Sequence, residues 1–329
     1  MQVFSSVRGL AGAGLMALGL AAAAPAAALT VYSAGPAPLI EALAAGFTKL
    51  SGEPVSVFQG TTGKIFARLE AEAANPQADV VISASWDSAV DLDQRGWLMP
   101  YASPKAASVP DVYKTSNYVA QGLSALALVW NTKSGTPRPG DWNDLTADAF
   151  RDKVNLPDPA QSGTALELLA GLVSAQGDKA WQLMSELRGN GAAVAGANAA
   201  ALNPVLQGAK AAVFGAVDYV AYGQKAKGEA IEVIFPSSGT VIAPRPMMIL
   251  KSTSQPEQAK AFIDYVLSSA GQTEVAKVYL IPATTGVPAQ RVGLADIPLL
   301  QPSRAVDGGT PPATDRATLL REFDQAFGR

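Results

Sequence analysis

The chain has 329 residues, of which 48% are hydrophobic, enough for about two domains with cores of their own. Only 16% of the residues are charged, and 25 basic against 28 acidic residues give a net charge of -3, which argues against a nucleic-acid-binding surface. The sequence contains neither histidine nor cysteine, so it excludes His/Cys zinc sites, thiolate or imidazole catalysis and disulfides.

The first 28 residues have the pattern of a secretory signal peptide. Arg8 precedes an apolar stretch from Gly9 to Ala24, and the small residues Ala26 to Ala28 predict cleavage after Ala28. The stretch is short and rich in Ala and Gly, which disfavours a membrane anchor, and no later run of about 18 apolar residues follows. Without a cysteine the chain has no site for a lipoprotein anchor, so we expect a soluble protein in the periplasm.

After the signal peptide the apolar patterns alternate between strand and helix. The expected strands are 29–33, 55–58, 78–82, 124–131, 154–156 and 211–215, and the expected helices are 39–50, 65–75, 142–152, 165–174, 217–227, 257–268 and 314–327. This alternation predicts an α/β fold with mostly parallel sheets.

Two extended segments, 118–131 and 240–250, are predicted to cross between two lobes. We therefore expect residues 1–28 to be a signal peptide, 29–122 with 242–282 to form lobe 1, and 123–241 to form lobe 2. Residues 283–329 form a C-terminal segment in which 305–313 is an exposed loop and a final helix packs on the lobes.

Small hydroxyl residues follow the predicted strands, where open α/β sheets bind ligands and where helix N-termini favour anions. Hydroxyls and free backbone N–H groups can hold an oxyanion without any titratable residue. The expected ligand-binding residues are Ser33, Gly35, Thr61, Thr62, Ser83, Ser85, Ser162, Gly163, Thr164, Asp218 and Tyr219.

Each of these residues also has an ordinary structural interpretation. Ser and Thr stabilise helices as N-caps, and Asp218 is equally explained as the cap of the helix that follows it. Lys64 after Gly63 resembles a phosphate loop, but Phe58 and Ile65 stand where that motif needs Gly and Ser or Thr, so a nucleotide-hydrolase site is excluded.

Several segments, in their order along the chain, resemble the family 1 extracellular solute-binding proteins of ABC importers. These segments are Leu29–Ser33, Asn75–Val81, Val129–Lys133, Ser162–Thr164 and Pro256–Ile263. The most similar branch holds ferric-iron, 2-aminoethylphosphonate and sugar-phosphate binders. The resemblance implies the two-lobe periplasmic binding protein fold of type II, with a hinge and a ligand cleft between the lobes.

In iron-binding members of that branch, the resemblance implies a histidine at the position of Pro36, a glutamate at Ala84 and a tyrosine pair at Asp218 and Tyr219. Only one phenolate is retained here, which makes a poor ferric site. We therefore expect no metal, no cofactor and no catalytic residues, but a small anionic solute such as a phosphonate or phosphate ester, with Asp218 free to meet an amine.

The leading interpretation is a monomeric binding protein that delivers its solute to an ABC permease in the inner membrane. A ferric-iron-binding protein of the same family remains an alternative. An exported enzyme on this fold, using carboxylates or Lys64, and a ligand sensor that docks on a membrane receptor are alternatives of a different class. Unchanged, stoichiometric binding of the ligand would exclude the enzyme.

Overall fold

The computed structural model describes residues 1–2, 28–300 and 316–329. Nearly all of the predicted signal peptide and the loop predicted at 305–313 lie outside the described residues. The strands are β1 (Leu29–Ser33), β2 (Val55–Gln59), β3 (Val80–Ile82), β4 (Tyr118–Asn131), β5 (Val154–Leu156), β6 (Ala193–Val194), β7 (Ala212–Val217), β8 (Ile231–Ile234), β9 (Ile242–Ile249) and β10 (Ile281–Pro282). The helices are α1 (Ala37–Ser51), α2 (Thr62–Ala71), α3 (Trp86–Gln94), α4 (Gly163–Gln176), α5 (Asp178–Gly189), α6 (Asn198–Leu206), α7 (Asp218–Ala226), α8 (Pro256–Val266), α9 (Ser269–Lys277) and α10 (Arg316–Phe327). None of these helices is both long and apolar enough to cross a bilayer, a statement limited to the residues just given.

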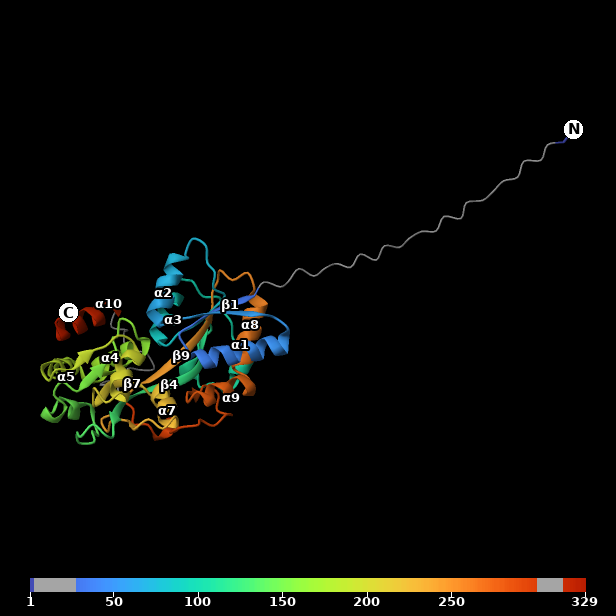
Figure 1. Cartoon of the computed structure of the whole chain (residues 1–329). Helices are drawn as coiled ribbons and strands as arrows, with labels where there is room; N and C mark the ends of the chain where they lie inside the picture. Colours follow the sequence, from blue (N-terminus) through green and yellow to red (C-terminus); the bar gives the residue numbers. More distant parts are fainter. Residues whose placement is uncertain (3–27, 301–315) are drawn as a thin grey trace.

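Two long strands, β4 and β9, connect the two lobes (Figure 1). The strand order is β2-β1-β3-β9-β4-β7-β5-β6, with β8 and β10 also paired to β4. The expected parallel pairing holds for the outer strands, β1 with β2 and β3, and β5 with β6 and β7. The expectation of mostly parallel sheets must be corrected to a mixed sheet, because every described pairing of β4 or β9 is antiparallel. A strand that passes from one lobe to the other cannot follow the right-handed βαβ path that makes its neighbours parallel.

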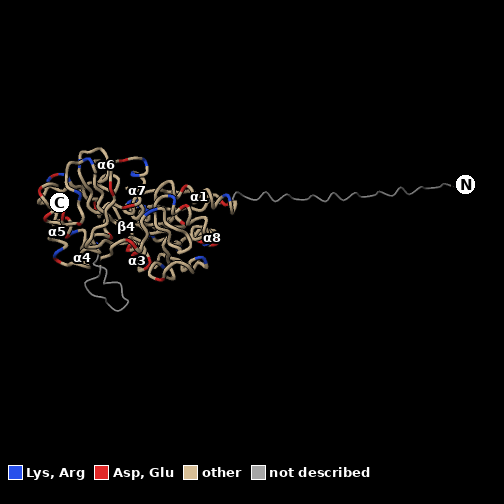
Figure 2. The backbone as a smooth tube through the Cα atoms, turned by 90° about the horizontal axis from the view of Figure 1, so that it is seen from below, with Lys and Arg blue, Asp and Glu red and all other residues tan. Residues whose placement is uncertain are grey.

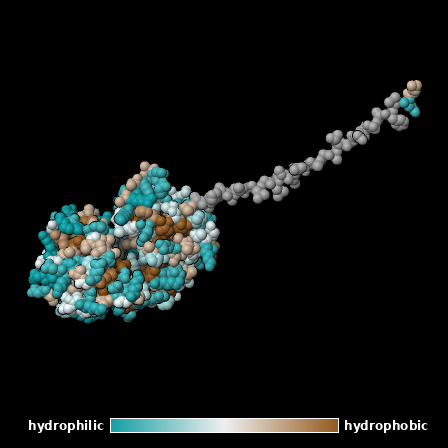
Figure 3. Space-filling view, in the orientation of Figure 1, coloured by the Kyte–Doolittle hydropathy of each residue, from teal (hydrophilic) through white to brown (hydrophobic). Residues whose placement is uncertain are grey.

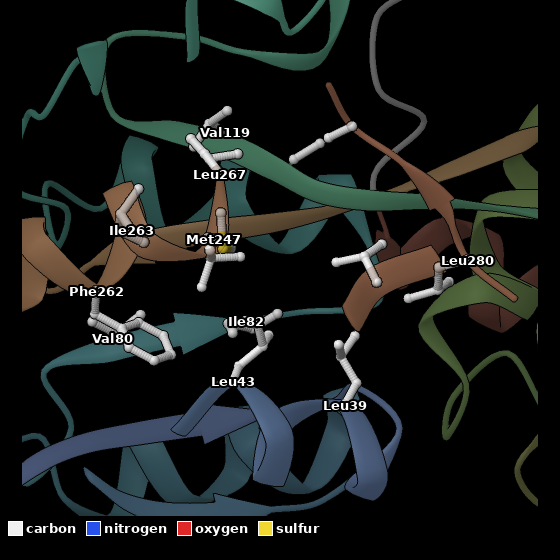
Figure 4. Close-up of a cluster of buried hydrophobic side chains, with 14 of the residues drawn as sticks. Leu39, Leu43, Val80, Ile82, Val119, Met247, Phe262, Ile263, Leu267 and Leu280 are labelled. Carbon is white, nitrogen blue, oxygen red and sulfur yellow. The ribbon is translucent and has the colours of Figure 1, made fainter. Parts of the chain in front are cut away.

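Each lobe has its own apolar core. In the first lobe, side chains of α1, α8 and α9 pack on those of β1, β3 and the first half of β4 (Figure 4). This cluster includes Leu43 of α1, Ile82 of β3 and Phe262 of α8. A second cluster joins the end of β4 to α4, α5 and α10, with Leu319, Phe323 and Phe327 of α10 inside it. In the space-filling view hydrophobic residues show mainly toward the middle of the molecule (Figure 3). The fold is thus a two-lobe α/β fold whose lobes meet along the crossing strands.

One predicted helix is wrong. Residues 142–152 form two short 3₁₀ turns, Trp142–Thr146 and Asp148–Phe150, in place of an α-helix. The buried Trp142 ring donates from Nε1 to the Gly239 carbonyl at 2.9 Å, while Asp141 accepts the Trp142 N–H and the Ser238 N–H. These bonds to another loop hold the segment in tight turns, so tertiary contacts override its helical pattern.

Candidate anion-binding cleft

The most unusual side chain in the cleft is Arg245 of β9, which is fully buried. Its Nη2 donates to the Ala34 carbonyl at 2.6 Å, but Nε and Nη1 have no hydrogen-bond partner in the described part of the chain. A buried guanidinium with open donors is costly unless an anion completes it. Nε and Nη1 lie on either side of Cδ in the planar guanidinium, so they offer two separate donors to the oxygens of an anion.

Arg245 lies near the ends of β1 and β3, next to the segments in which Ser33, Gly35 and Ser83 were predicted to bind a ligand. Ser33 ends β1, is fully buried, and accepts the Gly35 N–H through Oγ at 3.0 Å. Ser83 follows β3, and its N–H donates to the carbonyl of Pro246, the residue next to Arg245, at 3.0 Å. The strands β1, β3 and β9 are neighbours, so their ends bring Ser33, Ser83 and Arg245 to one edge of the sheet.

The two predicted residues that follow β2, Thr61 and Thr62, have different roles. Thr61 is the N-cap of α2 and accepts the Lys64 N–H through Oγ1, which confirms the structural interpretation for this residue. Thr62 instead turns toward the next loop, where its Oγ1 accepts the Ala84 N–H at 3.4 Å.

Gly163 at the start of α4 brings the lobes into contact. A Cβ atom at this position would lie 2.8 Å from Thr62 Oγ1 and 3.0 Å from Ser85 Cβ, both of which belong to the other lobe. The same region borders a cavity of about 330 Å³ that is open to the surface between α2, α3, α4 and α10. The small residue at 163 therefore permits a close approach across the cleft.

Ser162 and Thr164 are buried, and their hydroxyl groups lie 3.1 Å apart. Ser162 caps α4 by accepting the Ala165 N–H, and Asn198 Nδ2 donates to both hydroxyls at 2.8 and 3.0 Å. Asn198 Oδ1 is buried without a partner among the described residues. The predicted Ser-Gly-Thr segment is thus joined by an amide from α6 that the sequence patterns did not reveal.

Asp218, at the start of α7, is fully buried but is not free to meet a ligand amine, which corrects that expectation. Its carboxylate accepts the N–H groups of Ala125 at 2.7 Å and Tyr219 at 2.6 Å, and it forms an ion pair with Arg291, whose side chain is also fully buried. Burial raises the pKa of Asp218 to about 6, an effect that Arg291 opposes. The positive group that Asp218 meets therefore comes from the C-terminal segment of the chain itself.

Tyr219 lies between the two lobes, in contact with both apolar cores. The guanidinium carbon of Arg245 is 5.6 Å from the centre of its ring. Arg291 packs between the rings of Tyr222 and Phe235, at 4.9 and 5.4 Å, and its Nη2 is a buried donor without a partner in the described chain. Arg245, Tyr219 and the Asp218–Arg291 pair therefore form one continuous group at the hinge.

The N-terminus of α3 looks from the sequence like a second anion site, but a side chain of the protein already fills it. Glu167 of α4 accepts the Ser85 hydroxyl at 3.0 Å, the Asp87 N–H at 3.4 Å and the Trp86 N–H through the same Oε1 atom. Burial, and then the nearby charge of Asp87, raise the pKa of Glu167 to about 7. Ser85 consequently binds a carboxylate from the other lobe.

Arg245, Glu167, Asn198 and Arg291 were not predicted, although two of them leave a signal in the sequence. Arg245 is the one charge in the strand Ile242–Ile249, and Glu167 is the one charge in the helix Gly163–Gln176. A charge within an apolar element must be paired where the element is buried. Asn198 and Arg291 have no such signal, because they reach the site only through the tertiary fold.

Within the described ranges, no three acidic residues come close enough together to hold a metal ion, and the chain has no His or Cys. The charges that do gather on α3 are acidic, as Figure 2 shows. They belong to Asp87, Asp91 and Asp93, while the donors at the hinge belong to arginines.

The family is settled by sequence comparison. A family model described as bacterial extracellular solute-binding protein matches residues 75–305. The chain belongs to this family. An uncharacterized protein of Haemophilus influenzae is 29% identical over 277 residues, covering 78% of this chain and 79% of that protein. A putative 2-aminoethylphosphonate-binding periplasmic protein of Salmonella typhimurium is 24% identical over 243 residues, covering 70% of each.

Solved structures of bacterial binding proteins share the fold over nearly the whole chain. The periplasmic binding protein AfuA of Actinobacillus pleuropneumoniae, solved with fructose-6-phosphate bound, has a TM-score of 0.81 at 23% identity and covers 92% of this chain and 98% of its own. Iron-bound HitA of Pseudomonas aeruginosa has a TM-score of 0.76 at 21% identity, covering 90% and 99%. At these identities the likeness shows the two-lobe fold and leaves the ligand open.

Proposed function

We propose that this solute-binding protein captures a small organic oxyanion, a phosphonate or phosphate ester, between its lobes and delivers it to an ABC permease. The single observation that carries the proposal is the pair of open donors on the fully buried Arg245. Relatives and neighbours described as 2-aminoethylphosphonate-binding and as fructose-6-phosphate-bound support the same ligand class.

The surroundings of Arg245 suit an anion better than a cation. Arg291 adds a second buried guanidinium with an open donor, and the carboxylate beside it, Asp218, is occupied by that guanidinium and by two backbone N–H groups. Ferric iron needs several anionic oxygen ligands, whereas this hinge offers Tyr219 and two positive charges. An iron-binding function, favoured by the likeness to HitA, is therefore the second candidate.

The remaining features of the proposal are those expected from the sequence. Residues 1–28 are a signal peptide that sends a soluble, unlipidated monomer to the periplasm. Residues 29–122 with 242–282 form lobe 1 and residues 123–241 form lobe 2; the separate apolar clusters on either side of the crossing strands support this division. The site residues Ser33, Gly35, Ser83, Ser162 and Thr164 contribute hydroxyl and backbone groups around Arg245 once the solute is bound.

The test is isothermal titration calorimetry with 2-aminoethylphosphonate, sugar phosphates, inorganic phosphate and ferric citrate. We expect tight one-to-one binding of a phosphonate or phosphate ester, and recovery of that compound unchanged, which separates a binding protein from an enzyme. Binding of ferric citrate alone would contradict the proposed ligand class in favour of the iron-binding alternative.

A further inference from the structure

The contact between Glu167 and α3 joins the two lobes directly. Glu167 is on α4, whose neighbours Leu166 and Leu168 belong to the core of the second lobe. Its three donors, the Ser85 hydroxyl and the N–H groups of Trp86 and Asp87, belong to α3 and its N-cap in the first lobe. Figure 1 shows α3 in the first lobe and α4 in the second.

The N-terminus of α3 depends on this contact. The first N–H groups of a helix have no partner inside the helix, and an N-cap side chain usually accepts from them. Ser85 occupies the N-cap of α3 but makes no capping hydrogen bond; its hydroxyl donates to Glu167 instead. A carboxyl group from the opposite lobe thus takes the place of the missing cap, and the helix dipole favours its charge.

We propose that Glu167 is an interlobe latch that holds the cleft closed in the absence of solute and sets how easily the lobes separate. Opening the cleft withdraws the carboxyl group from all three donors at once, and it removes the close contact of Gly163 with Thr62 and Ser85. The consequence for solute release rests on the proposed function, whereas the closed state of the free protein does not.

The latch is expected to respond to pH. Burial and the charge of Asp87 raise the pKa of Glu167 to about 7 in the closed form, while in an open cleft the hydrated carboxyl would titrate near its usual value of about 4.3. The closed form therefore holds the proton more tightly, so closure is favoured as the pH falls through about 7. A protonated carboxyl still accepts through its carbonyl oxygen, so the contact survives while the buried charge is removed.

Other charged groups face this region from the neighbouring helices. α3 contributes Asp87 and Asp91, its C-cap contributes Arg95, and α10 contributes Arg316, which opposes the rise in the pKa of Asp87. α2 lines the adjacent cavity only with Thr62, Gly63 and Phe66. Arginines stay charged throughout the range, so among the groups around Glu167 the change between about pH 8 and 5.5 belongs to the Glu167–Asp87 pair. Asp218, whose pKa is raised to about 6, lies apart from this contact at the hinge, and its titration persists in variants at Glu167.

The test measures the separation of the lobes in the ligand-free protein. Since the chain has no cysteine, a nitroxide pair at Ala71→Cys on α2 and Gln325→Cys on α10, both exposed, reports the width of the cleft by pulsed electron resonance. In the protein with Glu167 unchanged, we expect the distance between the two nitroxides to shorten as the pH falls from about 8 to about 5.5. Glu167→Gln, which mimics the protonated carboxyl, should give the short distance at both pH values, and Glu167→Ala the long distance at both.

A control variant at Glu186, an exposed residue of α5 in the same lobe, should behave as the unsubstituted protein when changed to Gln. If Glu167→Ala leaves the distance distribution unchanged at both pH values, the latch is overturned. The same samples are then titrated with a sugar phosphate. If the distances respond to the Glu167 variants but the ester does not bind, the latch is supported and the proposed ligand class is refuted. If the ester binds but the distances do not respond to the variants, only the latch is refuted.

Discussion

The cleft contains two clusters of hydrogen-bond donors that look alike in the sequence and differ in the structure. At the hinge, Arg245 is buried with Nε and Nη1 open. At the N-terminus of α3, the donors are equally suited to an anion, but Glu167 accepts all of them. The donors of Arg245 are therefore open to a ligand, whereas those at the N-terminus of α3 are already bound by a side chain of the protein.

An anion-binding pattern in a sequence therefore identifies hydrogen-bond donors, but it does not show whether their acceptor is a ligand or another part of the chain. Ser33 ends β1 and Ser85 follows β3, the strand parallel to it, and both are small hydroxyl residues before a helix. The lobe on the far side of the cleft supplies the carboxylate that Ser85 meets, whereas the guanidinium near Ser33 comes from β9 of the same lobe.

The largest effect is expected when the buried ion pair between Asp218 and Arg291 is broken. Asp218→Asn removes the charge that pairs with the buried Arg291, and breaking a buried ion pair by removing one partner costs about 3 to 5 kcal/mol. We expect a fall of that size in the free energy of unfolding, measured with urea at neutral pH. Glu232→Gln, which breaks the more exposed pair with Arg138, is the matched control and should cost under about 1 kcal/mol. Equal small losses would show that the Asp218 pair is not structural.

The next effect tests the open site. Arg245→Gln keeps a polar side chain but removes the guanidinium fork, and hydrogen bonds to charged groups contribute about 1.5 to 3 kcal/mol each. We expect affinity for a phosphate ester to fall by about 100-fold or more by calorimetry. Arg151→Gln on the surface of the second lobe should leave it unchanged. If Arg245→Gln binds as tightly as the parent protein, the open donors do not mark the ligand site.

Closure of the lobes can be tested at the glycine between the two clusters. Gly163→Ala places a Cβ atom 2.8 Å from Thr62 Oγ1, so the closed state must shift. We expect roughly tenfold weaker solute binding, through a faster dissociation rate measured by stopped flow. Gly189→Ala, where the added atom meets nothing within 4 Å, is the control. Equal dissociation rates in both variants would mean that the lobes do not need this approach.

The smallest effect concerns the amide that joins the predicted hydroxyls. Asn198→Ala removes the two hydrogen bonds to Ser162 and Thr164 at the rim of the cleft. Neutral hydrogen bonds contribute about 1 kcal/mol each, so we expect roughly fivefold to thirtyfold weaker solute binding by calorimetry. Asn203→Ala, an exposed position on the same helix, should have no effect. An unchanged affinity for both would place Ser162 and Thr164 outside the ligand site.

Much of the fold could be predicted from patterns of neighbouring residues. The helix at Ala37–Ser51, the strand at Val55–Gln59 and the crossing strand at Tyr118–Asn131 follow from local periodicity and from glycine and proline positions. The helix predicted from Trp142 was wrong because the turns found there depend on Gly239 and Ser238, about a hundred residues away. Periodicity carries no information about such partners.

The sequence by itself determined the absence of His and Cys chemistry, the alternation of strands and helices, the two crossing segments and the loops in which polar residues gather. Tertiary structure alone decided which donors are open. Arg245 is left without acceptors at the hinge, Asp218 is paired by Arg291, and Glu167 caps α3 from the other lobe. The physical reason is that satisfying a buried polar group requires a partner at hydrogen-bond distance. Arg291 is 73 residues from Asp218 along the chain, Trp86 is 81 residues from Glu167, and Ala34 is 211 residues from Arg245.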